Sequence, residues 1–303
     1  MSKRFITGPI LVFVLLGVIL LDGWLDTVQL RGVWQDMLLG RTHPPRGLVL
    51  FIGCVAVAAL AARDLSNMSE AAGIKTKSWL TAVAAVAGLA MCYVLPLLGT
   101  TSTILAVVAT TMIVVFIAAL LTFSRHRNFE GVLAAAGAVV FAMVYLGFML
   151  GFFLMLRRDH STWWIVGIIL ATKSCDIGAY LTGRAIGRHK LIPWLSPGKT
   201  WEGLVGGVIT AAIIGIGLAA ASGLLNSPSD HIPIGVGAIA GIVFAIVGQF
   251  GDLAVSLFKR DAGVKDSSSL LPGMGGVLDV LDSPLMVAPV AYWLLTVAVG
   301  PGT

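Results

Sequence analysis

Long apolar stretches, separated by short polar segments, restrict what this chain can fold into. Hydrophobic residues make up 57% of its 303 residues and charged residues 12%, and the mean hydropathy is +0.95. These values lie outside the range of water-soluble domains. A helix needs about 20 mostly apolar residues to cross the hydrocarbon layer. Nine stretches approximately meet this need, and they are residues 8–22, 46–62, 79–98, 101–123, 132–156, 163–182, 203–225, 234–257 and 284–299.

The apolar stretches are continuous, and they lack the alternation of a transmembrane barrel. The expected fold class is therefore an all-α polytopic integral membrane protein with about nine transmembrane helices. Basic residues favour cytoplasmic loops, and their distribution predicts a cytoplasmic N-terminus and an external C-terminus. In that orientation Lys173 falls inside a span and most other basic residues lie on the inner side. The basic residues expected outside are Arg31, Arg41, Arg46, Arg157 and Arg158.

Two hydrophilic segments, residues 175–207 and 251–283, contain most of the polar chemistry. The second holds five Asp, three cations, a Ser run and a Gly-Gly pair between membrane-grade apolar sequence. Both segments are expected on the cytoplasmic side, so their side chains can build one site. Residues 1–131 carry no comparable cluster and are predicted to be N-terminal transmembrane helices, whereas residues 132–303 carry the predicted site.

Three carboxylates in the second segment are candidate metal ligands. Mg²⁺ is bound by one or two carboxylates together with substrate phosphates. If the last helix begins near Val277, the spacing of Asp279 and Asp282 puts both on one helical face. Asp252 ends a span, and an Asp at membrane depth is costly and typical of a functional site. A solvated carboxylate at a helix end is the alternative for Asp252.

Lys173 and Asp176 lie inside the sixth predicted span with a spacing that puts both on one helical face. That spacing allows an ion pair between them. A purely structural pair and a functional one are equally compatible with the sequence.

The cations Lys259, Arg260 and Lys265 are candidate phosphate-binding residues. Arg can grip a phosphate with two hydrogen bonds, and Lys acts as a point charge. Gly275 and Gly276 would let backbone amides approach phosphate oxygens closely. The alternative is that these cations are only topology signals.

The sequence SPGKT in the first segment resembles the end of the nucleotide-binding P-loop motif. The first glycine of that pattern falls at Pro193, however, and no strand is expected before it in an all-helical chain. Ser196 and Thr200 could cap a helix that starts near Trp201, which would leave amides free for an anion beside Lys199. Capping alone explains the same residues.

From Ser256 the segment SLFKRDAGVKDSSSLLPGMGGVLDVLDS resembles the C-terminal signature of the phosphatidate cytidylyltransferases, also called CDP-diglyceride synthetases. The pattern of that family is approximately S-x-x-K-R-x-x-x-x-K-D-x-x-x-x-x-P-G-H-G-G-x-x-D-R-x-D-S. The upstream DIGAYLTGRAIGRHKLIPWLSPGKTWEGLVGG is similar to the family's other loop. The positions that match the signature are Ser256, Lys259, Arg260, Lys265, Asp266, Pro272, Gly273, Gly275, Gly276, Asp279, Asp282 and Ser283.

The resemblance implies an enzyme of the cytoplasmic (inner) membrane whose active site faces the cytoplasm. It would join CTP and phosphatidate to give CDP-diacylglycerol and pyrophosphate. The implied cofactor is Mg²⁺, with K⁺ as a candidate second cation, and the implied partners are CTP, phosphatidate and anionic membrane lipids rather than nucleic acid. A homodimer is compatible with it.

The resemblance also implies a role for each matching residue. The implied metal centre consists of Asp252, Asp279 and Asp282. The cations that would neutralise phosphates are Lys199, Lys259, Arg260 and Lys265. The residues that would shape the nucleotide pocket are Ser196, Thr200, Glu202 and Asp266.

Two positions depart from the family pattern. Met274 replaces a His, and Val280 replaces an Arg, so a donor and a permanent cation are both missing. These departures keep open a non-catalytic homolog that binds nucleotide or lipid phosphate. A membrane transporter with a relay through Lys173, Asp176 and Asp252 is a further alternative.

Overall fold

The computed structural model describes residues 2–30, 42–98, 100–124, 130–224 and 230–300. Within these ranges the chain is almost entirely helical. The elements are α1 (Ser2–Leu25), α3 (Leu48–Ala71), α4 (Ser78–Leu98), α5 (Thr101–Phe123), α6 (Val132–Ala142), the π-helix η2 (Met143–Phe148), α7 (Met149–Asp159), α8 (Thr162–Ile186), β1 (Lys190–Ile192), β2 (Ser196–Thr200), α9 (Trp201–Ser222), α10 (Ile234–Asp261) and α11 (Val277–Val299).

The described residues contain nine helices that are long and apolar enough to cross a membrane, with α6, η2 and α7 forming one of them. The predicted fold class is therefore confirmed. Some helix ends differ from the predicted ones, because a helix can extend beyond its continuous apolar stretch at either end. Helix α3 runs to Ala71 rather than residue 62, and α11 begins at Val277 rather than residue 284. Arg31 and Arg41 lie outside the described residues.

A short β-hairpin follows α8, and it corrects one prediction. Strands β1 and β2 pair antiparallel, with Lys190 opposite Thr200 and Ile192 opposite Ser196. The expectation that no strand precedes SPGKT was wrong, because a three-residue strand is too short to leave an apolar pattern. SPGKT itself forms β2, so it is the second strand of a hairpin rather than a loop between strand and helix.

Glycines let the last helices approach one another closely. A Cβ at Gly206 on α9 would clash with α8, and one at Gly215 would clash with the backbone of Gly237 on α10. Gly251 on α10 likewise packs directly against the backbone carbonyl of Asp282 on α11. Small residues at such crossings allow backbone contact between membrane helices. The crossing at Gly251 brings the polar residues of α10 and α11 together.

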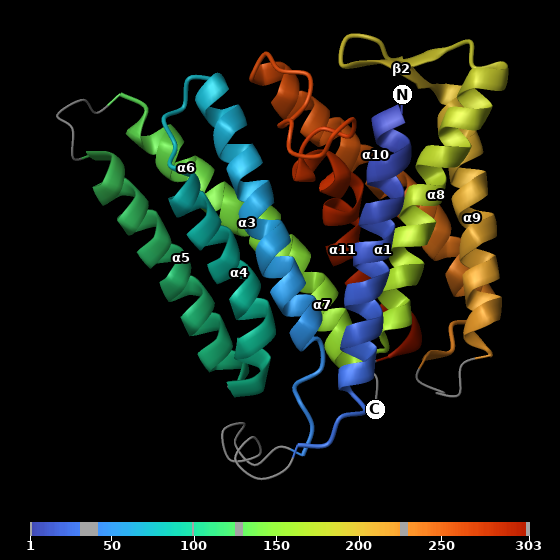
Figure 1. The fold of residues 1–303 in the computed structure, drawn as a ribbon, viewed down its shortest axis with the longest axis horizontal. Helices are drawn as coiled ribbons and strands as arrows, with labels where there is room; N and C mark the ends of the chain where they lie inside the picture. The colour runs from blue at the N-terminus through green and yellow to red at the C-terminus, as the bar shows by residue number, and fades with distance from the viewer. Residues whose placement is uncertain (1, 31–41, 99, 125–129, 225–229, 301–303) are drawn as a thin grey trace.

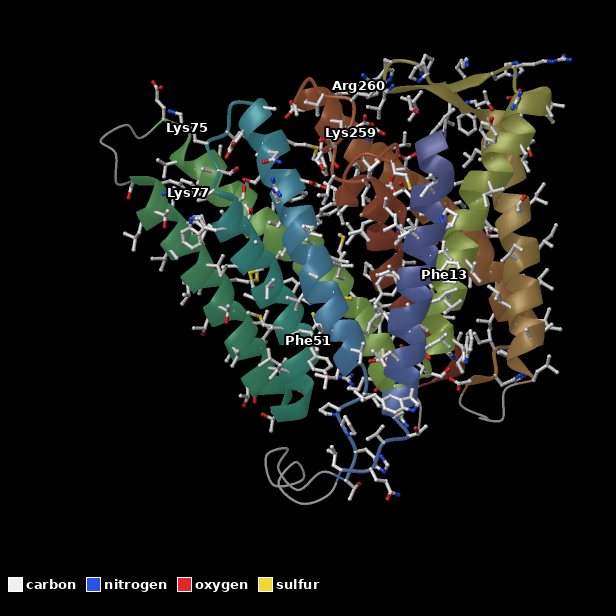
Figure 2. The ribbon with its side chains drawn as sticks, in the orientation of Figure 1. Phe13, Phe51, Lys75, Lys77, Lys259 and Arg260 are labelled. Carbon is white, nitrogen blue, oxygen red and sulfur yellow. The ribbon has the colours of Figure 1, made fainter. Side chains whose placement is uncertain are left out.

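Both hydrophilic segments lie at one end of the helix bundle. The hairpin, the loop of residues 262–276 and the N-terminus are at the top of Figure 1, and the C-terminus is at the bottom. Figure 2 shows Lys75, Lys77, Lys259 and Arg260 at that same end, which we call the basic end. The prediction that the two segments share one side is confirmed.

Candidate active site

Charged side chains from both hydrophilic segments meet between α8, α10 and α11. The charged cluster consists of Lys173, Asp176, Lys199, Asp252 and Asp282. These residues come from α8, β2, α10 and α11, so residues far apart in the sequence form one site below the hairpin.

Two lysines hold the carboxylates of the charged cluster together. The Nζ of Lys199 lies 2.6 Å from Oδ2 of Asp252 and ties the hairpin to α10. The Nζ of Lys173 lies 3.3 Å from Oδ2 of Asp176 and 3.3 Å from Oδ1 of Asp282. The predicted pair of Lys173 with Asp176 is confirmed, and the second contact makes it part of the site.

The charged cluster carries more carboxylates than ammonium groups. Three carboxylates share two ammonium groups, and Asp252 and Asp282 lie close enough to interact directly. Like charges in a partly buried site repel one another. The side chain of Asp282 is only 10% exposed, so water screens this repulsion weakly. A divalent cation between Asp252 and Asp282 would relieve it, and carboxylate oxygens are the ligands that Mg²⁺ prefers.

The third expected metal ligand is engaged differently. Asp279 accepts a hydrogen bond from Lys259 Nζ at 2.6 Å through Oδ1. Its Oδ2 accepts from the backbone N–H of Ser267 at 2.8 Å, from the Ser267 hydroxyl at 2.8 Å and from the Gly276 N–H at 2.9 Å. Oδ2 therefore holds the 262–276 loop against the start of α11, and Oδ1 ties α11 to Lys259 on α10. Among the described residues, no three acidic, His or Cys side chains are arranged around a common metal position.

The glycine pair serves close packing rather than an open anion site. Gly275 has φ +95°, a conformation that strains other residues, and its N–H donates to the Leu271 carbonyl at 3.1 Å. A Cβ at Gly276 would clash with Ser267 Oγ and Asp64 Oδ2. Because both amides donate within the protein, the structure does not support the expectation that they bind phosphate.

Asp64 is a site residue that sequence reasoning missed. It lies on α3 and is 2% exposed. Its Oδ2 accepts from the Leu278 N–H at 3.2 Å and lies 3.5 Å from Ser267 Oγ. An amide at a helix start has no partner within the helix, so Asp64 supplies one to α11. A carboxylate close after a predicted apolar span was the available signal.

The first segment anchors the hairpin to α9. Thr200 accepts from the Gly203 N–H at 3.1 Å and so caps α9, as one of the two alternatives predicted. Glu202 binds His189, with 2.6 Å between Oε1 and Nδ1. Ser196 is half-buried at the start of β2.

The remaining predicted charged residues are exposed. Arg260, Lys265 and Asp266 are exposed at the basic end, and within the described ranges they form no ion pair with protein groups. The two departures from the signature lie beside the site. Met274 belongs to the turn in which its N–H donates to the Leu271 carbonyl at 2.9 Å, and Val280 follows Asp279 on α11.

Comparisons with known proteins identify the family of the chain. The model of the cytidylyltransferase family matches residues 37–298. The uncharacterized protein YnbB of Escherichia coli (strain K12) is 43% identical over 131 residues, which are 43% of this chain and 42% of that protein.

Two curated relatives have named activities. A phosphatidate cytidylyltransferase of Haemophilus influenzae is 39% identical over 135 residues, 43% of this chain and 44% of that protein. Another of Chlamydia muridarum is 36% identical over 183 residues, 57% of this chain and 59% of that protein. The chain thus spans about half the length of the curated relatives it matches.

Proposed function

Since the chain belongs to the cytidylyltransferase family, we propose that it transfers a cytidylyl group from CTP to phosphatidate, giving CDP-diacylglycerol and pyrophosphate. The observation that carries this proposal is the charged cluster, to which both hydrophilic segments contribute at the basic end of a membrane bundle. The relatives named phosphatidate cytidylyltransferase support the choice of lipid substrate.

The proposed reaction brings two polyanions into contact. A phosphate oxygen of phosphatidate forms a bond to the α-phosphorus of CTP, the bond to the bridging oxygen breaks, and pyrophosphate leaves with the electron pair. Alignment of the two reactants and neutralisation of their charge supply most of such catalysis. No covalent enzyme intermediate is needed.

Each part of the site has a proposed role in that alignment. Asp252 and Asp282 would hold Mg²⁺, which supplies positive charge to the reacting phosphates when bound. Lys199 presents a largely buried side chain from strand β2, and Lys173 presents a partly exposed one from α8. In this proposal Lys199 binds CTP and Lys173 binds the lipid phosphate.

Exposed cations complete the proposed nucleotide site. Arg260 and Lys265 are free to bind the triphosphate at the mouth of the charged cluster. Asp279 organises the loop that carries Lys265 through its bonds to Lys259 and Ser267. We further propose that the basic end faces the cytoplasm, where CTP is available and basic residues are favoured.

The proposal is tested with purified protein in mixed micelles that contain labelled CTP, Mg²⁺ and phosphatidate, followed by extraction of nucleotide-bearing lipid. Product is expected with the native chain and with Asp261→Asn, an exposed Asp outside the charged cluster. It should disappear with Asp282→Asn. Nucleotide binding without product would instead indicate a non-catalytic homolog, and substrate-dependent ion flux without product would indicate a transporter.

A further inference from the structure

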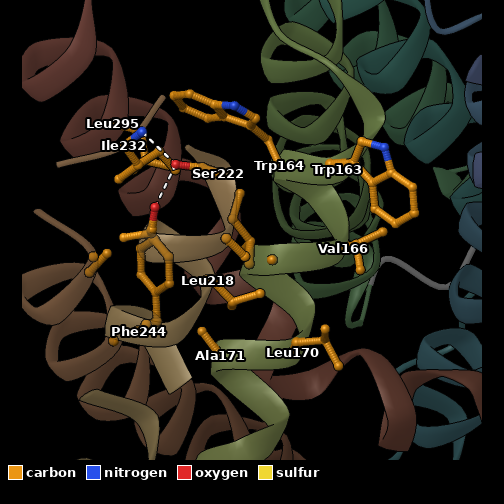
Figure 3. A pocket seen from close by; sticks show the side chains of 18 of the residues that line it. Trp163, Trp164, Val166, Leu170, Ala171, Leu218, Ser222, Ile232, Phe244 and Leu295 are labelled. Carbon is orange, nitrogen blue, oxygen red and sulfur yellow. Dashed lines mark hydrogen bonds between the residues drawn. The ribbon is translucent and has the colours of Figure 1, made fainter. Parts of the chain in front are cut away.

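An apolar cavity of about 260 Å³ lies between α8, α9 and α10, in the half of the bundle away from the basic end. Figure 3 shows Trp164, Leu218 and Phe244 around it. Engineered apolar cavities of about 150 Å³ stay dry and bind hydrocarbons. This one is therefore large enough for a segment of hydrocarbon.

Two polar side chains on the cavity wall, Ser222 and Asp230, have partners within the protein, whereas the buried Nε1–H of Trp164 has no hydrogen-bond partner among the described residues. The Ser222 hydroxyl donates to the Ala219 carbonyl at 2.7 Å and accepts from the Ile232 N–H at 2.8 Å, the contact drawn in Figure 3. Asp230 accepts from the Ser161 N–H at 3.2 Å. Most of the lining side chains are aliphatic or aromatic, so the chemistry of the wall favours an aliphatic chain.

The cavity is accessible from the lipid side of the bundle. Trp163 and Leu170 line it while 49% and 50% of their surfaces are exposed. Both lie on α8, a helix that spans the membrane. A lipid chain can therefore enter laterally, without passing through the protein core.

One face of α8 connects the cavity to the charged cluster. Val166 and Leu170 line the cavity, and Lys173 follows them at positions i+7 and i+3, which keeps these three residues on one helical face. The side chains of Lys173 and Asp176 are 35% and 39% exposed. A lipid lying along this face would place its phosphate beside Lys173 and its chain at the cavity.

The lengths agree with this placement. Residues 163–171 of α8 cover about 12 Å at the helical rise, and one acyl chain spans about half of the ~30 Å hydrocarbon layer. The phosphate site at Lys173 lies on α8 two residues beyond the end of the cavity nearest the basic end, and residue 163 at the far end lies about 15 Å from Lys173 at the helical rise. A long chain would thus fill the cavity to its far end, whereas a short chain would fill only the part nearest Lys173.

We propose that this cavity binds the distal part of an acyl chain of the lipid substrate and makes the enzyme selective for long chains. The proposal rests on the proposed function for the identity of the lipid. The phosphate of that lipid would be bound at Lys173, because the cavity and that lysine share one open face of α8.

Gly167→Leu is the test variant, since a Cβ at Gly167 would meet only Leu218 Cδ1 at 3.8 Å and a Leu side chain would fill the cavity. Gly217→Leu is the matched control, because a Cβ there has open surroundings and Gly217 does not line the cavity. For dipalmitoyl phosphatidate we expect Gly167→Leu to raise KM about tenfold, the usual size of a pocket mismatch, without lowering kcat. For dioctanoyl phosphatidate, whose chains fill less of the cavity, the rise in KM should be clearly smaller, and Gly217→Leu should alter neither value. Equal effects on both lipids, or no effect on either, would overturn the proposal.

A measurement without turnover separates this proposal from the proposed function. Phosphatidate brominated midway along its chains should quench the fluorescence of Trp164, measured as the difference between the native chain and Trp164→Phe. Quenching without product formation would leave the cavity assignment standing and remove the enzymatic one. Equal quenching by brominated phosphatidylcholine would show that bulk lipid occupies the cavity, and the proposal would fail.

Discussion

The contact between Asp64 and α11 gives a quantitative prediction about how the N-terminal helices serve the site. Asp64→Ala removes the acceptor of the Leu278 N–H and leaves that amide buried without a partner. Loss of a cap costs about 1 kcal/mol, and a hydrogen bond to a charged group contributes about 1.5 to 3 kcal/mol. Because the two effects overlap, we expect about 2 kcal/mol of destabilisation, which corresponds to a fall of about 4 to 8 °C in unfolding temperature for a chain of this size.

Asp64→Ala should also lower the catalytic rate, by more than its effect on the free energy of unfolding would suggest. Leu278 lies about one turn before Asp282 on α11, so a shift at the start of the helix moves a proposed metal ligand. Misplacement of reacting groups by about 1 Å can cost about a hundredfold in rate. We therefore expect Asp64→Ala to lower kcat by about tenfold to a hundredfold, with a smaller change in KM for CTP. Asp64→Asn keeps an oxygen acceptor and loses only the charge at the helix start, about 0.3 to 1 kcal/mol, so it should be intermediate.

The assays are thermal unfolding in detergent and initial rates in mixed micelles. Glu70→Ala is the matched control, because Glu70 is an exposed carboxylate on the same helix, α3. It should match the native chain in both assays. If Asp64→Ala also unfolds and turns over like the native chain, the inferred role of α3 in supporting the site is wrong.

Three further predictions concern the site itself. Lys199→Ala removes the ion pair that ties the hairpin to α10, so KM for CTP should rise more than the KM for phosphatidate in initial-rate measurements. Asp279→Ala leaves Lys259 without its partner, and loss of about 3 kcal/mol should appear as a lower unfolding temperature. Met274→His combined with Val280→Arg restores a donor and a cation beside the site, and a higher kcat is expected; an unchanged kcat would show that neither departure limits turnover.

Some features of the fold and the site could be predicted from the sequence because they depend on local pattern. Apolar runs predict the membrane helices, since each must satisfy its own backbone within lipid. The three-residue spacings of Lys173 with Asp176 and of Asp279 with Asp282 predict shared helical faces, and the first pair does form at 3.3 Å.

Other features depend on packing between distant segments, which a local pattern does not contain. The bond from Asp64 to Leu278 joins residues 214 positions apart, and it forms only because α3 packs against α11. The role of Asp279 could not be predicted from the sequence for the same reason. Its spacing places it beside Asp282 on the helix, but whether its oxygens face a metal or the loop amides depends on how residues 262–276 fold back.

The backbone contact at Gly251 has a consequence for ion selectivity. Because α10 crosses α11 at a residue without a side chain, the separation of the carboxylates of Asp252 and Asp282 is fixed by how closely two helices can approach. Mg²⁺ requires oxygen ligands at about 2.0 to 2.1 Å, whereas Ca²⁺ accepts about 2.3 to 2.6 Å. A single methyl group at this crossing would hold the helices apart and should make the proposed Mg²⁺ site more tolerant of the larger ion.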